Sequence, residues 1–415
     1  MKKANLVSVP TLVESPFIVV TIGGYTFGSY IEGGQYNLNG IHSNVDFPNY
    51  MKSLEITKVN GTVNSYTLVF EYHVEYGQDP NLLDKVFSSA SADRRIVLSY
   101  GDWNAPNDIY KEETGIITNV TSNLDTAAAV ITYTVNCVSD AIGLTSTAFN
   151  FPAKEAKPSD VLLDMVNNAR YGLKQVFTGM NNLDLVKSMG LIASTDKTVQ
   201  LLAQTMATPL EYMNYLVSNM IPKGTDQTKG LSSSKYFLSI HDDVMNKYGG
   251  TYFKVTEVSA KQKTVNSTDT YELDVNFPTD NFITQFSLTN DQSWAILYDY
   301  SQKLDQQTYS YKVNNEGKVV RQYAPSIMKS SVTNAISNGE YTWWSNMTSF
   351  PIEATITLKG LTRPSILMTY VKLNVWFSGG QKHVSSGTYI ITKQVDKIDS
   401  NGYTTTLTLL RVGGD

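Results

Sequence analysis

Residues able to carry out catalysis or bind a metal ion are few and widely spaced in this chain. Its four histidines are His42, His73, His241 and His383, and its one cysteine is Cys137. None of the histidines has a second ligand at the spacing of a metal site, and a lone cysteine provides no second thiolate. We therefore predict no zinc site and no internal disulfide, and we expect Cys137 to be a small core residue on the inward face of a strand.

The densest cluster of chemically active residues is His241-Asp242-Asp243. A hydrolase would need these groups to converge in a cleft, and a hydrolase built on them stays open as a hypothesis. Consecutive residues at the start of a predicted helix point in different directions, and aspartates there interact favourably with the helix dipole. The pattern favours helix capping or a solvated surface for this cluster.

Other catalytic patterns are missing from the sequence. Glu112-Glu113 stands at the start of a predicted strand, where nothing indicates a glycosidase pair. The chain has no Gly-x-Ser-x-Gly elbow, and the glycines at 33, 34 and 40 are not followed by the Gly-Lys-Ser or Gly-Lys-Thr of a phosphate loop. We predict a structural or assembly protein, without enzymatic activity, cofactor or metal.

Length and composition describe an ordered chain that favours β structure. The 415 residues allow two to four domains, and 41% of them are hydrophobic while 17% are charged. The 26 tyrosines and 15 phenylalanines favour strands, and the net charge of −5 gives no basic surface for reading nucleic acid. No run approaches the roughly 18 to 20 apolar residues of a membrane span, so we predict no membrane-spanning segment.

The C-terminal residues have the clearest secondary-structure pattern. Residues 353–359 alternate apolar and polar side chains, and residues 364–377 are apolar on both faces. Residues 387–398 and 403–412 flank Asp399-Ser400-Asn401-Gly402, and Asn-Gly between two such runs predicts a hairpin. A helix is predicted at 325–337, before these strands.

The N-terminal residues show the same order of elements. Residues 54–59 and 63–76 flank Asn60-Gly61, and a short helix capped by Asp79 is predicted after them. A strand at 96–100 and a hairpin of 113–120 with 129–138 follow. Both regions therefore contain strands, one inserted helix, a further strand and a closing hairpin, although the match concerns the order of elements and not residue identity.

Between these two regions the hydrophobic period becomes helical. Residues 145–157 are predicted as a linker, and helices are predicted from Pro158, over 196–206, and from a capping box at Thr208. Strands at 236–240 and 251–258 complete a small α+β unit. The expected fold is α+β but mostly β: a first β tube domain at 1–150, a helical α+β middle domain at 151–268 and a second β tube domain at 269–415. Each tube domain is expected to be a barrel or sandwich.

Three stretches resemble the baseplate hub proteins of phage tails and contractile injection machines. They are residues 54–76 with the helix after them, residues 282–300 and residues 383–411. The likeness is one of layout and covers most of the chain. In this family, two β tube domains per subunit, assembled as a trimer, present six similar domains in a ring, so that a sixfold tail tube can meet a threefold spike.

The resemblance implies a structural virion protein, namely a homotrimeric tail or baseplate hub that is assembled in the host cytoplasm and acts as a symmetry adaptor. Its expected partners are the tail tube protein, a spike or tip protein and other baseplate proteins, with DNA only in transit through an axial channel during ejection. Three copies of two equivalent domains can satisfy six equivalent neighbours. The chain ends after its closing hairpin, so a spike or wall-degrading function is expected on another chain.

Exposed-looking aromatic residues and edge strands provide the expected contacts between subunits. These candidates are Tyr25, Phe27, Trp103, Tyr110, Trp343, Trp344, Trp376 and Tyr389. The alternative function is a receptor- or carbohydrate-binding appendage of a virion, in which Trp103, Trp343 and Trp344 would form stacking surfaces.

Overall fold

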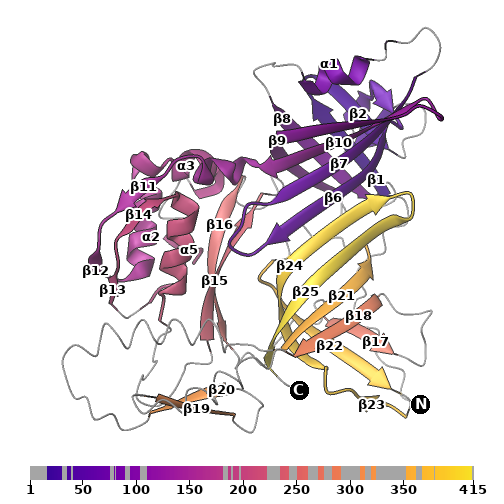
Figure 1. The fold of residues 1–415 in the computed structure, drawn as a ribbon. Coiled ribbons are helices and arrows are strands. Elements are labelled where there is room, and N and C mark those ends of the chain that lie inside the picture. Colours follow the sequence, from indigo (N-terminus) through magenta and orange to yellow (C-terminus); the bar gives the residue numbers. More distant parts are fainter. Residues whose placement is uncertain are drawn as a thin grey trace.

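The computed structural model describes residues 16–29, 35–38, 41–74, 79, 81–88, 94–102, 110–180, 186–187, 190–195, 198–221, 234–242, 250–259, 270–274, 283–290, 309–313, 319–323, 352–360, 367–377 and 379–413. The largest element in these residues is one 15-stranded sheet that contains strands from both ends of the chain. Figure 1 shows the yellow C-terminal strands beside the indigo and purple N-terminal strands.

The sheet consists of two segments. The N-terminal sheet segment contains β1 (Pro16–Ile22), β2 (Tyr25–Ser29), β5 (Phe47–Pro48), β6 (Met51–Val59), β7 (Ser65–His73), β8 (Arg95–Asp102), β9 (Tyr110–Asp125) and β10 (Val130–Ser139). The C-terminal sheet segment contains β17 (Thr270–Asp274), β18 (Ile283–Asn290), β21 (Ile352–Lys359), β22 (Tyr370–Phe377), β23 (Gln381–Lys382), β24 (Gly387–Asp399) and β25 (Gly402–Gly413). The main strand order is β18-β21-β25-β24-β6-β7-β10-β9-β8-β1-β2-β5, and β22 pairs with β17, β23 and β24.

Alternating side chains explain why these runs are strands with one buried face. Tyr66, Leu68, Phe70 and Tyr72 on β7 are all buried, while the residues between them are half-buried. Helix α1 (Leu82–Ser88) covers this core face with Leu83, and the carboxylate of Asp79 accepts a hydrogen bond from the Asn81 N–H at the helix start. Two small sheets, β3 (Gln35–Leu38) with β4 (Ile41–Asn44) and β19 (Tyr309–Val313) with β20 (Val319–Tyr323), stand apart from the large one.

The Asn-Gly hairpins confirm the sequence prediction. Gly61 and Gly402 have φ values of 70° and 107°, a region that disfavours side chains with a Cβ atom. Gly61 joins β6 to β7, and Gly402 begins β25 directly after the turn from β24. Both turns are therefore formed by the residue types that the backbone requires.

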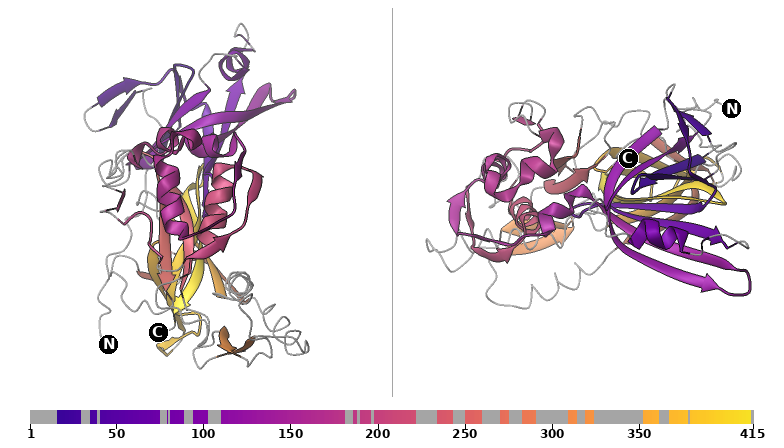
Figure 2. Two further views of the ribbon diagram at one scale, coloured as in Figure 1. Left: turned by 90° about the vertical axis from the view of Figure 1, so that its left-hand side faces the viewer. Right: turned by 90° about the horizontal axis from the view of Figure 1, so that it is seen from above.

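The middle of the chain forms a separate helical and β layer. Its elements are η1 (Asp140–Thr145), β11 (Phe149–Phe151), β12 (Lys154–Ala156), α2 (Pro158–Asn167), η2 (Ala169–Tyr171), α3 (Leu173–Val176), η3 (Thr178–Met180), β13 (Val199–Leu201), β14 (Gln204–Ala207), α5 (Pro209–Ser218), β15 (Ser234–His241) and β16 (Tyr252–Ser259). Figure 2 shows these helices to one side of the large sheet.

Two predictions for this middle layer are wrong. Within the helix predicted at 196–206, the described residues 198–206 are not helical, because Val199 and Leu201 point to one buried face of a short strand that pairs with β12. Residues 145–157 are not a plain linker, because they contribute β11 and β12. The helix from Pro158 and the capping box at Thr208 are confirmed, with Glu211 accepting the Thr208 N–H and Thr208 Oγ1 accepting the Glu211 N–H.

The described residues bury three hydrophobic cores. One lies under the N-terminal sheet segment, one under the C-terminal sheet segment, and one in the middle layer. Ile398 and Tyr403, from the tip of the β24/β25 hairpin, belong to the N-terminal core although they are C-terminal in sequence. The hairpin tip therefore fastens the two sheet segments together.

The mostly β composition is confirmed, but the sheets of the described residues are open and do not close into a barrel within one chain. The helix predicted at 325–337 lies outside the described residues, as do residues 291–300 of the stretch 282–300. Among the residues that the structure describes, no helix is long and apolar enough to cross a membrane.

Candidate functional site

The place where the two sheet segments meet is the strongest candidate for a functional site. Strand β6 pairs with β24 in antiparallel register, from Val59 opposite Lys393 to Leu54 opposite Ile398. In the described part of the large sheet, this is the one strand pairing that joins the two segments. We call this pairing the junction.

A buried ion pair lies on the core side of the junction. Lys58 of β6 and Glu113 of β9 are fully buried and form a salt bridge, and the Tyr100 hydroxyl donates a hydrogen bond of 2.8 Å to Glu113 Oε1. Burial, together with the Glu113 charge, raises the pKa of Tyr100 well above its ordinary value. The phenol is therefore neutral and acts as a donor to the carboxylate.

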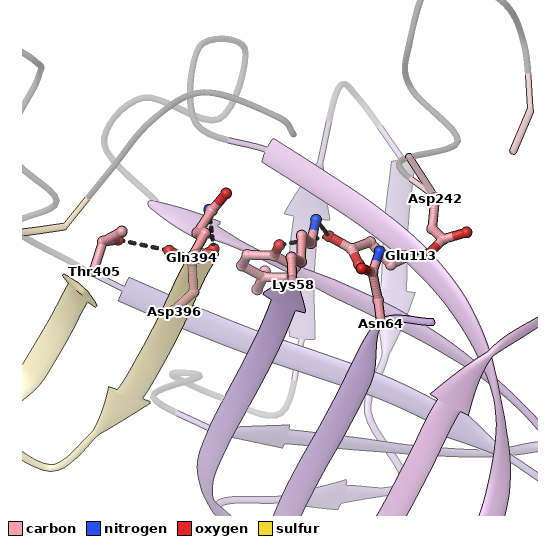
Figure 3. A network of polar contacts seen from close by, with 8 residues as sticks. Lys58, Asn64, Glu113, Asp242, Gln394, Asp396 and Thr405 are labelled. Atoms are coloured by element: carbon pink, nitrogen blue, oxygen red, sulfur yellow. Dashed lines mark hydrogen bonds and ion pairs between the residues drawn. The ribbon is translucent and has the colours of Figure 1, made fainter. Parts of the chain in front are cut away.

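The C-terminal strands supply a second set of polar groups beside this pair. Gln394 Nε2 and Thr405 Oγ1 each donate a hydrogen bond of 2.6 Å to the buried carboxylate of Asp396. Burial and the Asp396 charge raise the pKa of Tyr403 well above its ordinary value. Figure 3 shows Asp396, Lys58 and Glu113 in one neighbourhood, although they come from β24, β6 and β9.

The middle layer supplies a third set. Asn64 Nδ2 donates to Asp242 Oδ2, and both side chains are buried. Burial and the Glu113 charge raise the pKa of Asp242 to about 7. Ser239 Oγ lies 2.8 Å from His241 Nε2, the imidazole stacks on Tyr252, and burial lowers the pKa of His241 to about 3.

The prediction that His241 and Asp242 cap a helix or lie on a solvated surface is wrong. Strand β15 continues to His241, so both residues are carried into the interior where the middle layer meets the junction. Asp243 lies outside the described residues. No group of three or more metal-ligating side chains occurs in the described ranges. The Asn64–Asp242 hydrogen bond joins the N-terminal segment to the middle layer, while Gln394 and Thr405 bind Asp396 within the C-terminal strands.

The two closing hairpins, β9/β10 and β24/β25, each contain a β-bulge at the same position. The bulged residue is Thr118 in β9 and Thr392 in β24. The same number of residues separates Thr118 from Asp125, at the end of β9, and Thr392 from Asp399, at the end of β24. Thr118 Oγ1 donates to Asn136 O at 3.0 Å, and Thr392 Oγ1 donates to Thr408 O at 3.3 Å. We call positions related in this way equivalent.

The equivalence extends to the neighbouring strands. The path β6-β7-β10-β9-β8 has the same chain order and strand directions as β18-β21-β25-β24-β22. A second pair of bulges lies at equivalent positions, Lys52 in β6 and Thr284 in β18. The Ile117 N–H donates to Arg94 O, and the equivalent Ile391 N–H donates to Thr369 O. The two paths differ at the outer strand, because β8 pairs antiparallel with β1 while β22 pairs parallel with β17.

A five-residue sequence with four identical residues occurs at equivalent positions of the two hairpins. We did not identify this short repeat from the sequence alone. Residues 114–118 read Thr-Gly-Ile-Ile-Thr and residues 388–392 read Thr-Tyr-Ile-Ile-Thr. Both stretches end at the bulged threonine. Thr67 of β7 and Thr355 of β21 also occupy equivalent positions.

The candidate contact residues have different surroundings. Tyr25 is 46% exposed and lies beside Phe47, and the half-buried Trp376 has the Lys382 ammonium 5.1 Å from its ring centre. Phe27 and Tyr389 are fully buried, Phe27 against Phe47 and Phe70 and Tyr389 with its hydroxyl donating to Ser385 O.

Phe27 and Tyr389 are thus core residues of this chain. The other candidates are less fully described. Tyr110 belongs to β9, while Trp103, Trp343 and Trp344, on which the carbohydrate-binding alternative depends, lie outside the described residues.

No protein-family model and no curated protein matches the sequence. Solved structures of similar fold include the 43 kDa tail protein of prophage MuSo2 from Shewanella oneidensis, with TM-score 0.48, 13% identity, and coverage of 96% of this chain and 99% of that one. A tail protein from Neisseria meningitidis has TM-score 0.49, 9% identity, and coverage of 96% and 97%. An E. coli component of the type VI secretion system, described as structurally similar to phage tail proteins gp27 and gp5, has TM-score 0.43, 9% identity, and coverage of 95% and 78%.

All of these TM-scores lie below 0.5. The function proposed below therefore rests on strand pairing and side-chain contacts within this chain.

Proposed function

We propose that this chain is a structural protein of a phage tail or related injection machine, a trimeric hub that joins a sixfold tail tube to a threefold spike or tip. The observation that carries the proposal is the repeated strand path with its two pairs of equivalent bulges. A chain that folds one sheet unit twice offers two similar faces to its neighbours. Three such chains in a closed ring offer six.

The junction supports this role because it fixes one unit against the other. A β6–β24 ladder and a shared apolar hairpin tip connect the two units, and buried polar groups of both segments lie beside the ladder. The Lys58–Glu113 ion pair lies within the N-terminal unit beside this ladder, and the rings of Tyr100 and Tyr403, one from each unit, have centroids 6.5 Å apart. The two units therefore keep a constant orientation, as a ring of defined symmetry requires.

The sheet face opposite the cores supports the proposed axial channel. Its central strands carry many hydroxyl side chains, namely Thr57, Thr67, Thr132, Thr134, Thr355, Thr357, Thr404, Thr406 and Thr408. Two lysines near this face have carboxylate partners: Lys52 lies 3.7 Å from Glu71, and Lys397 lies 2.9 Å from Asp399. Because DNA affinity comes mainly from cations that neutralise phosphates, a face rich in neutral hydroxyl groups suits a wall that DNA passes with little binding.

The chemistry of the junction supports a structural protein without enzymatic activity. The carboxylates of Glu113, Asp242 and Asp396 each accept a hydrogen bond from another protein side chain, and all three are buried. We propose the tail tube protein, a spike or tip protein and other baseplate proteins as partners, and the virion tail as the location.

Native mass measurement of the purified chain, with electron microscopy of the same sample, tests the proposal. The expected result is a mass of three chains and a ring with six similar lobes around a central channel. A chain that stays monomeric at high concentration and in the presence of its tail tube protein would contradict it.

A further inference from the structure

We infer that neighbouring copies of this chain join by antiparallel pairing of β18 of one copy with the outer part of β9 of the next, in the register that β6 and β24 use inside one chain. This inference rests on the proposed ring, and it specifies the contact that closes it. Strands β18 and β9 are the equivalents of β6 and β24.

Two strand edges are open at the required places. β18 stands at the end of the large sheet, where it pairs with β21 along one edge and with no strand of the described residues along the other. One edge of β9 is covered by β8 only as far as Ile117, so that residues 118–125 have no strand neighbour there in the described part of the chain. At the equivalent edge of β24, β22 covers the first residues and β6 covers 393–398. We call residues 118–125 and 283–290 the open edges.

The equivalent bulges fix the register of the proposed contact. Residues of β9 and β24 correspond when they are the same number of positions along the chain from the bulged Thr118 or Thr392. Residues of β18 and β6 correspond in the same way, counted from Thr284 or Lys52. Transferred to the open edges, the junction register places Val120 opposite Asn290, Thr121 opposite Thr289, Ser122 opposite Leu288, Asn123 opposite Ser287 and Leu124 opposite Phe286.

Apolar side chains of the open edges are exposed, whereas their equivalents at the junction are buried, as expected if the open edges still await a partner strand. Leu124 is 56% exposed, whereas its equivalent Ile398 is 0% exposed in the N-terminal core. Leu288 is 36% exposed, whereas its equivalent Ile56 is 0% exposed. The apolar side chains of the open edges would be covered by a neighbouring copy in the way that the junction covers Ile398 and Ile56.

Apart from Asp125, the last residue of β9, the open edges lack the residues that usually prevent strand addition. Residues 118–124 and 283–290 contain no charged residue and no proline. Exposed edges of monomeric proteins are commonly protected by lysine, proline or inward-pointing charges. Uncharged, unprotected edges of matched register favour a second copy of this chain as the partner strand.

Engineered disulfides test the strand pair and its register. The double variant Asn123→Cys/Ser287→Cys places one thiol on each open edge at directly opposed positions, where side chains are close enough to bridge. The variant Glu55→Cys/Lys397→Cys is the matched positive control, since these residues face each other at the equivalent place of the junction. Asn123→Cys/Leu288→Cys is the register control, because Leu288 lies on the other face of β18. The native Cys137 is buried in every variant.

Mild oxidation of Asn123→Cys/Ser287→Cys should give covalent species of two and three chains. Glu55→Cys/Lys397→Cys should give only a bridge within one chain. The single variants should give no covalent species of more than one chain. A mass of three chains without the Asn123–Ser287 bridge would overturn this inference and leave the ring in place. Covalent dimers from Ser287→Cys alone would show that β18 pairs with itself, which also overturns it. A monomer in all variants would overturn the ring as well.

Discussion

The junction and the open edges are built from equivalent strands but have opposite surroundings. At the junction, β6 lies against β24 and Ile56 and Ile398 are fully buried. At the open edges, Leu288 and Leu124 hold the equivalent positions and remain exposed. Since the local fold and bulges are the same, the difference in burial comes from whether a neighbouring strand is present. The junction therefore serves as a template for a contact between chains.

The junction and the open edges also differ in their polar side chains. Lys58 and Glu113 form a buried ion pair at the junction, while their equivalents are Asn290 and Gly387. The internal contact thus lies beside a buried ion pair of the N-terminal segment, whereas the proposed contact between chains has no charged pair at the equivalent positions. Accordingly, the internal contact should be permanent, and the contact between chains should depend on concentration.

The largest expected effect comes from breaking the ion pair. Glu113→Ala should lower the free energy of unfolding by about 3 to 5 kcal/mol, because Lys58 then remains buried without this carboxylate. Urea unfolding measures the change. Lys58→Met/Glu113→Leu, which removes both charges, should recover most of the loss. A cost below about 1 kcal/mol for Glu113→Ala would mean that the pair does not stabilise the core beside the junction.

The next effect concerns pH. Because the pKa of Asp242 is raised to about 7, the folded state holds a proton that the unfolded chain releases at its ordinary pKa near 3.8. The stability from this group is full below pH 3.8 and is lost as the pH rises towards 7. Asp242→Asn should therefore match the native chain near pH 4 and become more stable than it towards pH 7, by about 1.4 kcal/mol for each unit of pKa shift.

His241 makes the free energy of unfolding depend on pH in the opposite direction, so its effect must be distinguished from that of Asp242. Its pKa is lowered to about 3, so the stability that it contributes is present above its ordinary pKa near 6.5 and is lost on acidification. Unfolding curves of the native chain and of Asp242→Asn at matched pH values isolate the Asp242 effect, since both chains contain His241. A difference between them that does not change with pH would contradict the assignment.

A smaller effect is expected at the open edges, and it should appear in assembly and not in folding. Leu288→Asp should weaken association at least tenfold, because burial of a leucine contributes about 1.5 to 3 kcal/mol and each 1.4 kcal/mol is tenfold in affinity. Sedimentation at several concentrations measures it, with the melting temperature as the folding check. Leu202→Asp, at a position 64% exposed in the middle layer, is the matched control and should change neither quantity. Unchanged association of Leu288→Asp would argue against the edge contact.

The smallest effect is at the turn that anchors β6 to the middle layer. Gly61 has φ 70°, its N–H donates to Leu238 O, and a Cβ atom there would lie 2.6 Å from Asn214 Oδ1. Gly23→Ala has similar backbone strain at φ 57° but meets no atom within 4 Å. Both should cost about 1 to 2 kcal/mol from strain, and thermal unfolding should show a further loss for Gly61→Ala. Equal losses would mean that Asn214 moves without penalty.

Much of the fold could be predicted from local patterns. The Asn-Gly hairpins, the alternation on β7 and the capping box at Thr208 depend on residues close together in sequence, and all three are confirmed. Strands β12 and β13 were missed because each has three residues, too few for periodicity to distinguish from helix or loop, and they form by pairing with each other.

The polar groups of the junction could not be predicted in this way. Lys58, Glu113 and Asp242 are far apart in sequence, and charged side chains are ordinarily expected at the surface. Only the fold brings them together. The shared order of elements indicated that the two hairpins correspond, but not which residues do. The repeated Thr-x-Ile-Ile-Thr carries that information, and its meaning depends on the bulge, which no residue type reveals by itself.

A reconstruction of the purified assembly by electron microscopy, at a resolution that separates strands, tests the central claim most directly. It should show three chains in a closed ring with six similar strand junctions, three formed by β6 and β24 within chains and three formed by β18 and β9 between them. A ring whose chains meet through other strands, or an assembly that does not close, would contradict the account.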